Sequence, residues 1–462
     1  MAYETTDGTG LRSRLAAATN PVAATGDRID RHRKDIPVIV YNLFPLLVGD
    51  FSQWRPHLER ASRLGFDWVF INPIQAPGFS GSLYSIRDHF AINPLLLHPA
   101  SSVEPLEQAR LMVREAHRAG LKVLVDLVVN HTAIDCEQTS KHPEWYVRQD
   151  GRVQHPSCFE NGEKVVWGDL AQLDHEGTDD PEGLFAFVLE TARFLLRLGV
   201  DGFRCDAAYQ IPRATWARLF AALRAERSDL LFVAETLGCT PEETLETARA
   251  GFDFIFNSSK WWDFESDWLL QQYDLTRQVA PSIGFPESHD TERLLEASGG
   301  NAAASRQRYL FTALFSSGVM APIGFEFGFR RRLHVVHTRP AHWEATQVDL
   351  CPFIAEVHRV KRAHAVFHEE GPVRILQKGS VDLLVLHKAP LSGPGAAVIV
   401  LNKDVRRPQF FEVPSLSELF GPNVRWVKAA LPEGELHSAD APFRCELGEG
   451  NAVVLVAGDE LA

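Results

Sequence analysis

An arginine and three acidic residues in the middle of the chain have the spacing of a catalytic site. Arg204 and Asp206 are two positions apart in the apolar segment 200–207, and side chains two apart on a β-strand point to the same face. Glu235 and Asp290 end two later apolar segments. Carboxylates that converge on one site repel each other, so such a set persists only if a cation, a hydrogen-bond donor or a shared proton compensates it. Arg204 is the expected cation.

Two carboxyl groups in different environments could cleave a glycosidic bond. Arg204 would keep Asp206 ionised and hold its orientation, as a nucleophile that attacks carbon requires. Glu235, closer to apolar walls, would keep a raised pKa, so that it donates a proton to a leaving oxygen and later removes one from water or another acceptor. A retaining glycosidase needs such a pair about 5–5.5 Å apart.

A repeating α/β framework is predicted to position these residues. Amphipathic helical patterns, among them 54–65, 104–120, 183–199 and 216–229, separate short apolar segments, and several end in Gly just before the next segment. The expected strands are 37–44, 66–73, 121–129, 200–207, 230–237, 252–258, 281–290 and 321–328. Eight such units predict a (β/α)8 TIM barrel rather than an open doubly wound sheet.

The remaining regions divide the chain further. We expect a flexible N-terminal segment at 1–36, a catalytic barrel at 37–368 and a C-terminal all-β sandwich domain at 369–462, where short alternating apolar runs replace the helical pattern. Residues 131–181, after the third strand, are rich in polar and turn residues. A loop of this length usually has a function, and we interpret it as an inserted subdomain at the barrel mouth.

The carboxyl ends of the strands form the active site of such a barrel. Asp126 and then Asn130 and His131 fall at the end of the third strand, and His289 precedes Asp290 in the seventh. The polar residues of four strands should therefore meet at one mouth.

Four segments resemble, in order and spacing, the signature regions of the α-amylase superfamily of retaining glycoside hydrolases and transglycosidases. They are DLVVNH (126–131), GFRCDAA (202–208), VAETLG (233–238) and FPESHD (285–290). Segments 65–74, 167–174 and 318–328 resemble the secondary signatures of the same superfamily. The resemblance implies a TIM barrel enzyme that acts on α-1,4-glucan or malto-oligosaccharides.

The resemblance also implies roles for individual residues. Asp206 would be the nucleophile, Glu235 the acid/base and Asp290 the third carboxylate. The implied substrate-binding residues are Tyr84, Asp88, His131, Arg204 and His289, and Asp126 and Asn130 would support the site. No metal ligand is assigned, although Asn130 is a candidate calcium ligand. No cofactor is required, and calcium is an optional ion. Trp167, Trp261 and Trp262 are either core residues or sugar platforms.

Some positions depart from the superfamily pattern and leave alternatives open. Tyr209 and Gln210 stand where many amylases have Lys-His, which weakens the expectation of ordinary endo-acting starch hydrolysis. The GFE motif in 318–328 resembles that of maltosyltransferases that use maltose 1-phosphate, so transglycosylation is the alternative to hydrolysis. A non-catalytic sugar-binding relative is a third hypothesis. A metal-dependent hydrolase or aldolase is disfavoured, because the chain has no His-x-His pair and no strand-end Lys in a Schiff-base position.

Composition limits the partners and the compartment. The formal net charge of −13 disfavours nucleic acid or an anionic membrane as the main partner. The six cysteines are scattered without metal-ligand spacing, so buried free thiols are expected. Residues 1–35 lack the apolar core of a secretory signal, from which we expect a cytoplasmic protein. The sequence makes no prediction of oligomeric state.

Overall fold

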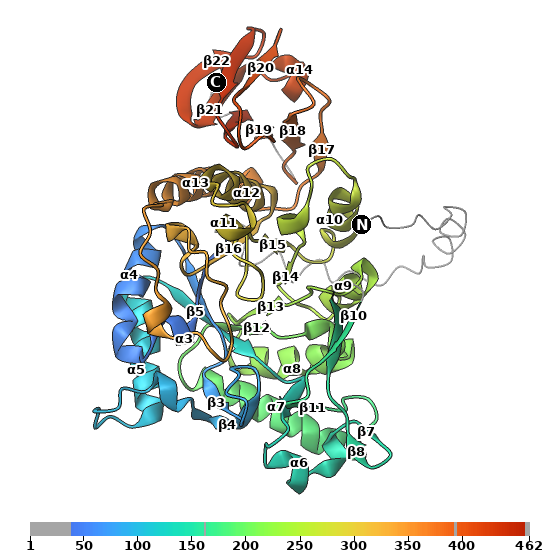
Figure 1. Ribbon diagram of the computed structural model, residues 1–462. Helices are drawn as coiled ribbons and strands as arrows, with labels where there is room; N and C mark the ends of the chain where they lie inside the picture. The colour runs from blue at the N-terminus through green and yellow to red at the C-terminus, as the bar shows by residue number, and fades with distance from the viewer. Residues whose placement is uncertain (1–37, 161–162, 392–394, 458–462) are drawn as a thin grey trace, which may run out of the picture. The chain divides into compact units, whose positions relative to one another are not determined.

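Eight parallel strands close into a barrel in the computed structural model, which describes residues 38–160, 163–391 and 395–457. Around the barrel the order is β1 (Val38–Leu43), β16 (Gly318–Pro322), β15 (Ser282–Gly284), β14 (Phe254–Phe256), β13 (Leu231–Ala234), β12 (Gly202–Cys205), β5 (Lys122–Leu127) and β2 (Trp68–Ile71) (Figure 1). The predicted (β/α)8 fold is confirmed. The predicted flexible segment 1–36 lies outside the described residues.

Alternation along each strand sorts its side chains into two layers. Val38, Leu124, Val233 and Phe256 belong to a cluster that fills the inside of the barrel, whereas the residues that alternate with them along the strands, such as Phe203, belong to the cluster shared with the surrounding helices. A period of two places residues 202 and 204 of β12 inside. Arg204 therefore enters the top layer of the barrel interior rather than the helical layer.

Amphipathic helices surround the barrel (Figure 1). They include α4 (Arg55–Arg63), α5 (Pro105–Arg118), α7 (Pro181–Leu196), α8 (Arg213–Glu226), α9 (Pro241–Ala248), α10 (Trp268–Thr276), α12 (Ala302–Phe315) and α13 (Cys351–Ala363). Their starts follow local chemistry: Asp180 caps α7, and Thr240 forms a capping box with Glu243 at the start of α9.

The eighth strand ends earlier than predicted. We expected 321–328, but β16 ends at Pro322 and is followed by a short 3-10 helix, η6 (Phe325–Phe327). Gly324, at φ 92°, turns the chain out of the strand, and a side chain there would collide with the Phe329 ring. The GFE motif is therefore a turn at the barrel mouth.

The segment after β5 forms small antiparallel pairs, as expected for an insertion between a strand and its helix. They are β6 (His131–Ala133) with β11 (Leu170–Gln172), β7 (Arg148–Gln149) with β8 (Arg152–Val153), and β9 (Ser157–Glu160) with β10 (Glu163–Val166); α6 (Gln138–Lys141) lies between β6 and β7. This segment runs directly on from the strand that carries Asp126.

The C-terminal strands form two antiparallel sheets. One has the order β17 (Val373–Ile375), β18 (Leu383–Lys388), β19 (Ala397–Asn402), β24 (Ala452–Ala457), β21 (Trp426–Leu431) and β22 (Glu433–Ser438), and the other pairs β20 (Gln409–Val413) with β23 (Phe443–Leu447). Both sheets contribute to one apolar cluster, for example through Val400 and Phe411. The predicted all-β C-terminal part is confirmed, and the boundary at residue 368 stays a prediction.

Two further expectations concern the described residues only. Five of the six cysteines, Cys136, Cys205, Cys239, Cys351 and Cys445, are free thiols. None of the described helices is both long and apolar enough to span a membrane.

Candidate active site

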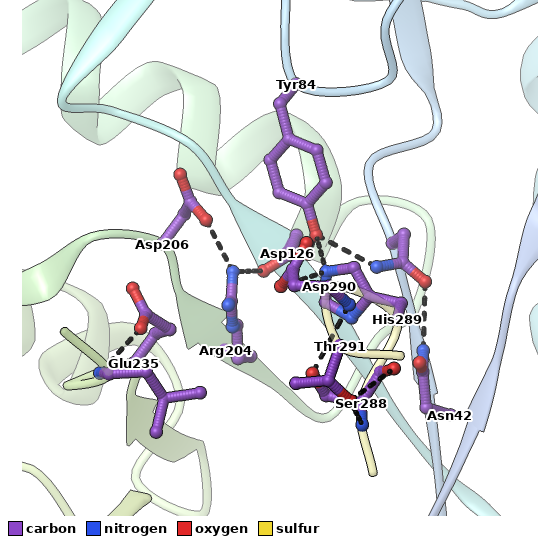
Figure 2. A network of polar contacts seen from close by, with 12 residues as sticks. Asn42, Tyr84, Asp126, Arg204, Asp206, Glu235, Ser288, His289, Asp290 and Thr291 are labelled. Atoms are coloured by element: carbon purple, nitrogen blue, oxygen red, sulfur yellow. Dashed lines mark hydrogen bonds and ion pairs between the residues drawn. The ribbon is translucent and has the colours of Figure 1, made fainter. Parts of the chain in front are cut away.

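Arg204 joins two carboxylates at the end of β12. Its Nη1 donates to Oδ1 of Asp126 at 2.8 Å and to Oδ1 of Asp206 at 2.5 Å (Figure 2). Arg204 pairs in register with Asp126 on β5, and Asp206 follows β12 directly. The side chains are 5%, 0% and 14% exposed for Arg204, Asp126 and Asp206. The predicted pairing of Arg204 with Asp206 is present, and the same cation also holds Asp126.

Glu235 occupies a different environment one strand away, after β13. The side chain is buried, and its carboxyl group accepts from the backbone N–H of Ala207 at 3.0 Å and of Leu237 at 2.7 Å. Burial raises the pKa of Glu235 to about 7, against the lowering effect of Arg204. Each carboxyl oxygen has a second lone pair, so the group can carry a proton while it holds both amides. The two acids thus differ as predicted. Asp206 is paired with the Arg204 cation, whereas Glu235 is buried and contacts no cation.

Ala207 connects the two acids through an unusual backbone conformation. This non-glycine residue has a left-handed φ of 42°, a conformation that costs free energy and that recurs at functional sites. It turns the chain directly after Asp206 and aims its own N–H at Glu235. The sequence does not indicate this conformation, because an alanine carries no signal of positive φ.

Tyr84 lies between the short strands β3 (Gln75–Pro77) and β4 (Ile86–Ile92) and connects the acids to His289. Its hydroxyl donates to Oδ2 of Asp126 at 2.7 Å, lies 2.7 Å from Nε2 of His289, and accepts from Nδ2 of Asn72 at 2.9 Å (Figure 2). Because the one hydroxyl proton goes to Asp126, Nε2 of His289 must be the donor to Tyr84. Burial lowers the pKa of His289, which keeps the ring neutral.

Asp290 is the most exposed of the three predicted catalytic acids. Its Oδ2 lies 3.0 Å from Nε2 of His289, and its side chain is 55% exposed. Ser288 shapes the turn before it, since the Ser288 hydroxyl accepts from Asp290 N and Thr291 Oγ1 accepts from Ser288 N (Figure 2). The side chain is therefore open to solvent at the mouth, where a ligand could reach it.

The two predicted histidines each have one engaged and one unpartnered nitrogen. His131 contacts the carbonyl oxygen of Tyr84 through Nε2 at 3.2 Å. Among the described residues, the buried Nδ1 atoms of His131 and His289 have no hydrogen-bond partner. An unpartnered buried polar atom carries a cost in free energy. Both atoms are buried, so neither offers an open contact to a ligand in this structure.

Asn130 lies beside an amide rather than a carboxylate, and its own Oδ1, the atom that could bind calcium, is buried without a hydrogen-bond partner among the described residues. Its Nδ2 donates to Oε1 of Gln210 at 2.9 Å, and Nε2 of Gln210 lies 3.4 Å from the carbonyl oxygen of Ser157. Calcium prefers several oxygen ligands that include carboxylates, whereas the side chain that contacts Asn130 is an amide. Among the described residues, the acids and histidines close enough to share an ion are His142, Glu144 and Asp180, and Asp180 already accepts from Trp145 and caps α7.

Asp88 is the predicted substrate-binding residue that the structure does not bring into this network. It is exposed on β4, its carboxylate accepts from Phe90 N at 2.9 Å, and it lines a separate cavity of about 310 Å³ together with Asp135 and Glu137. Asp88 and the buried His89 point to opposite faces of β4, which leaves Asp88 on the solvent side.

The structure adds residues at the ends of β1 and β2. Asn72 holds the Tyr84 hydroxyl, and Asn42 donates to Oδ1 of Asn72 at 2.9 Å. Asn72 directly follows β2, so the rule that applied to the other strand ends would have found it. Of the aromatic residues left open by the sequence, Trp262 is fully buried and Trp261 is half exposed.

Comparisons with known proteins find one family match and several sequence relatives. Residues 37–149 match the family described as glycogen debranching enzyme, glucanotransferase domain. An α-1,4-glucan:maltose-1-phosphate maltosyltransferase of Burkholderia pseudomallei is 27% identical over 379 residues, and neopullulanase 2 of Thermoactinomyces vulgaris is 24% identical over 392 residues. The matches cover 78% and 79% of this chain but 32% and 64% of those relatives.

A solved structure supports the fold. An α-amylase from Lactobacillus plantarum superposes with a TM-score of 0.73 at 20% identity, over 90% of this chain and 98% of that one. At 20% identity this likeness concerns the fold alone. The two sequence relatives are longer than their matched stretches, which are 32% and 64% of their lengths.

Proposed function

We propose that this chain, which is similar to enzymes of the α-amylase superfamily, is a retaining enzyme that cleaves α-1,4-glucan or malto-oligosaccharides. The observation that supports this most is the contrast between two acids at adjacent strand ends. Asp206 contacts the Arg204 guanidinium at 2.5 Å, whereas Glu235 is buried without a contacting cation and has a pKa of about 7. A retaining glycosidase needs one carboxylate and one carboxylic acid.

In the first step Asp206 attacks the anomeric carbon. Arg204 holds the Asp206 carboxylate in orientation, and the protonated Glu235 donates its proton to the glycosidic oxygen as the carbon–oxygen bond breaks. The sugar is then held as an ester of Asp206, and the leaving sugar carries the proton from Glu235. Asp290, His131 and His289 would bind sugar hydroxyls around the reacting carbon.

In the second step Glu235 acts as a base. Its carboxylate removes a proton from water, the oxygen of that water attacks the anomeric carbon, and the bond to Asp206 breaks with overall retention. The side chains and the sugar supply every reacting group, so the reaction needs no organic cofactor.

Transfer to a sugar hydroxyl instead of water is the second candidate. It is supported by the GFE motif, by Tyr209 and Gln210 in place of Lys-His, and by the maltosyltransferase among the relatives. The two reactions share the first step and differ only in the acceptor of the second.

The test separates the covalent step from the choice of acceptor. Maltosyl fluoride needs little acid assistance, so Glu235→Gln should accumulate a glycosyl ester on the peptide that contains Asp206, detected by mass spectrometry. Asp206→Asn is the matched control and should form no ester. With wild type and maltoheptaose, shorter products alone indicate hydrolysis, and longer chains indicate transfer. If no ester forms and no α-glucan is cleaved, the proposal is wrong.

A further inference from the structure

A buried ion pair closes the loop that carries two of the predicted site residues. Glu287 and Arg293 are each 1% exposed, and Nη1 of Arg293 lies 2.7 Å from Oε1 of Glu287. His289 and Asp290 lie between them in the chain. Residues 287–294 are here called the Asp290 loop. The mechanism above uses neither partner of the ion pair.

The remaining polar atoms of the pair bind the backbone. Oε2 of Glu287 accepts from the N–H of Leu294 at 2.5 Å. Nε of Arg293 donates to the carbonyl of Arg331 at 3.1 Å, and its Nη2 donates to the carbonyl of Ile323 at 2.9 Å. A buried charge is tolerated when a partner and hydrogen bonds compensate it in this way. Removing either side chain would leave the other charge buried without its partner.

These contacts attach the Asp290 loop to the strand ends on both sides of β15. Ile323 directly follows β16, and its N–H donates to the carbonyl of Asn42 in β1 at 2.8 Å. On the other side, Lys260 belongs to η5 (Ser259–Trp261), which follows β14. Nζ of Lys260 donates to the carbonyl of Pro286 at 3.2 Å. The loop is therefore held at its start and at its end.

The middle of the loop supplies contacts to the candidate active site. Nε2 of His289 lies 2.7 Å from the Tyr84 hydroxyl and 3.0 Å from Oδ2 of Asp290 (Figure 2). The Asp290 side chain is 55% exposed, so its place depends mainly on its backbone. That backbone is bound through its N–H to the Ser288 hydroxyl and through its carbonyl to the Arg332 guanidinium. The ends of the loop thus determine where Asp290 and His289 lie.

We propose that Glu287 and Arg293 are positioning residues, whose ion pair sets the place of Asp290 and His289 relative to Asp206. This inference rests on the proposed function. Apolar residues of the same volume are often as stable as a buried ion pair, so what this pair adds is the single arrangement that its hydrogen bonds specify. Catalysis depends on such an arrangement, because a misplacement of about 1 Å can lower a rate roughly 100-fold.

The first test measures kcat and KM separately on maltoheptaose. Glu287→Gln keeps the length of the side chain but removes its charge, and it cannot accept at both of its terminal atoms. We expect kcat to fall at least about tenfold and KM to change much less, because only the contacts around the reacting carbon move. Arg293→Lys, which keeps the charge, should lose less activity than Arg293→Met.

A similar ion pair at the other end of the barrel provides the matched control. Asp201 directly precedes β12 and lies 2.8 Å from Nη2 of Arg227. Arg227 also donates to the carbonyl of Val200, and Asp201 accepts from the N–H of Val123. Asp201→Asn should therefore lower the urea concentration at the midpoint of unfolding but keep kcat near wild type. All variants are compared at a temperature where circular dichroism shows them folded.

A second test separates positioning from a general loss of stability. With maltosyl fluoride, whose good leaving group keeps slow variants measurable, Glu287→Gln should cost a smaller factor in an Asp290→Asn background than in wild type. The reason is that residues which act as a unit are not additive. If Glu287→Gln does not fold, Arg293→Lys takes its place in both tests.

Two outcomes would overturn the inference: a folded Glu287→Gln variant with the kcat of wild type, or equal factors in the two backgrounds. If wild type acts on maltoheptaose and either outcome is found, the inference fails and the proposed function stands. If wild type neither shortens nor elongates any α-glucan, both fail.

Discussion

At the scale of single residues, the burial of Glu235 affects how both activity and stability depend on pH. Its pKa rises from the ordinary 4.5 to about 7, so the acid needed for the first step is present below about pH 7 and is lost above it. We expect kcat/KM for malto-oligosaccharide cleavage to fall as pH rises through 7. Glu235→Gln should lower kcat/KM at least about 100-fold and remove this pH limb, which a pH–rate profile would check.

The same shift predicts a gain in stability from that substitution. The folded state holds the Glu235 proton more tightly than the unfolded state, so this stabilising contribution is complete below pH 4.5 and is lost as pH rises to about 7. Each pKa unit corresponds to about 1.4 kcal/mol. The free energy of unfolding of Glu235→Gln relative to wild type, measured in urea, should therefore rise by up to about 3 kcal/mol between pH 4 and pH 8. A constant difference across this range would contradict the prediction.

At the scale of elements, the turn after β12 depends on the left-handed conformation of Ala207. A β-branched residue is strained in this conformation, whereas glycine adopts it freely. Ala207→Val should lose roughly 1–3 kcal/mol of stability and most of its kcat/KM, because the N–H that contacts Glu235 would move. Ala207→Gly should keep near-wild-type values of both. If the two variants behave alike, the backbone conformation is not what aligns the acids.

At the scale of the whole molecule, buried charge connects the barrel to the segment that leads to the C-terminal strands. Nζ of Lys361 is fully buried and donates to the carbonyls of Ala313, Ser316 and Phe367 at 2.6–2.8 Å. Lys361→Met would leave these three acceptors unsatisfied, and each costs about 1–3 kcal/mol. We expect a loss of at least about 3 kcal/mol in urea unfolding at pH 7.

An exposed lysine provides the control for this substitution. Lys378 forms a surface ion pair with Glu418, and such pairs contribute less than about 1 kcal/mol. Lys378→Met should therefore unfold almost like wild type. Equal losses for the two variants would show that the three carbonyl contacts of Lys361 do not stabilise the fold.

Much of this protein could be predicted from the chain alone. The alternation of apolar strands and amphipathic helices determined the barrel, because those two periodicities dictate which faces must be buried. Four polar segments at strand ends then located Asp206, Glu235 and Asp290, since parallel strands bring their carboxyl ends to one mouth. The spacing of Arg204 and Asp206 was sufficient to predict their contact.

Other features depended on contacts between distant segments, which local patterns do not encode. Tyr84 meets Asp126, Asn72 and His289 only because four strand ends converge, and Asp88 points away from them although it is four residues from Tyr84. The left-handed turn at Ala207 and the hydrogen bond from Arg332 to the carbonyl of Asp290 likewise follow from the packing around them. Sequence thus determined which residues reach the barrel mouth, and tertiary structure decided which of them touch, because hydrogen bonds depend on positions fixed by the whole fold.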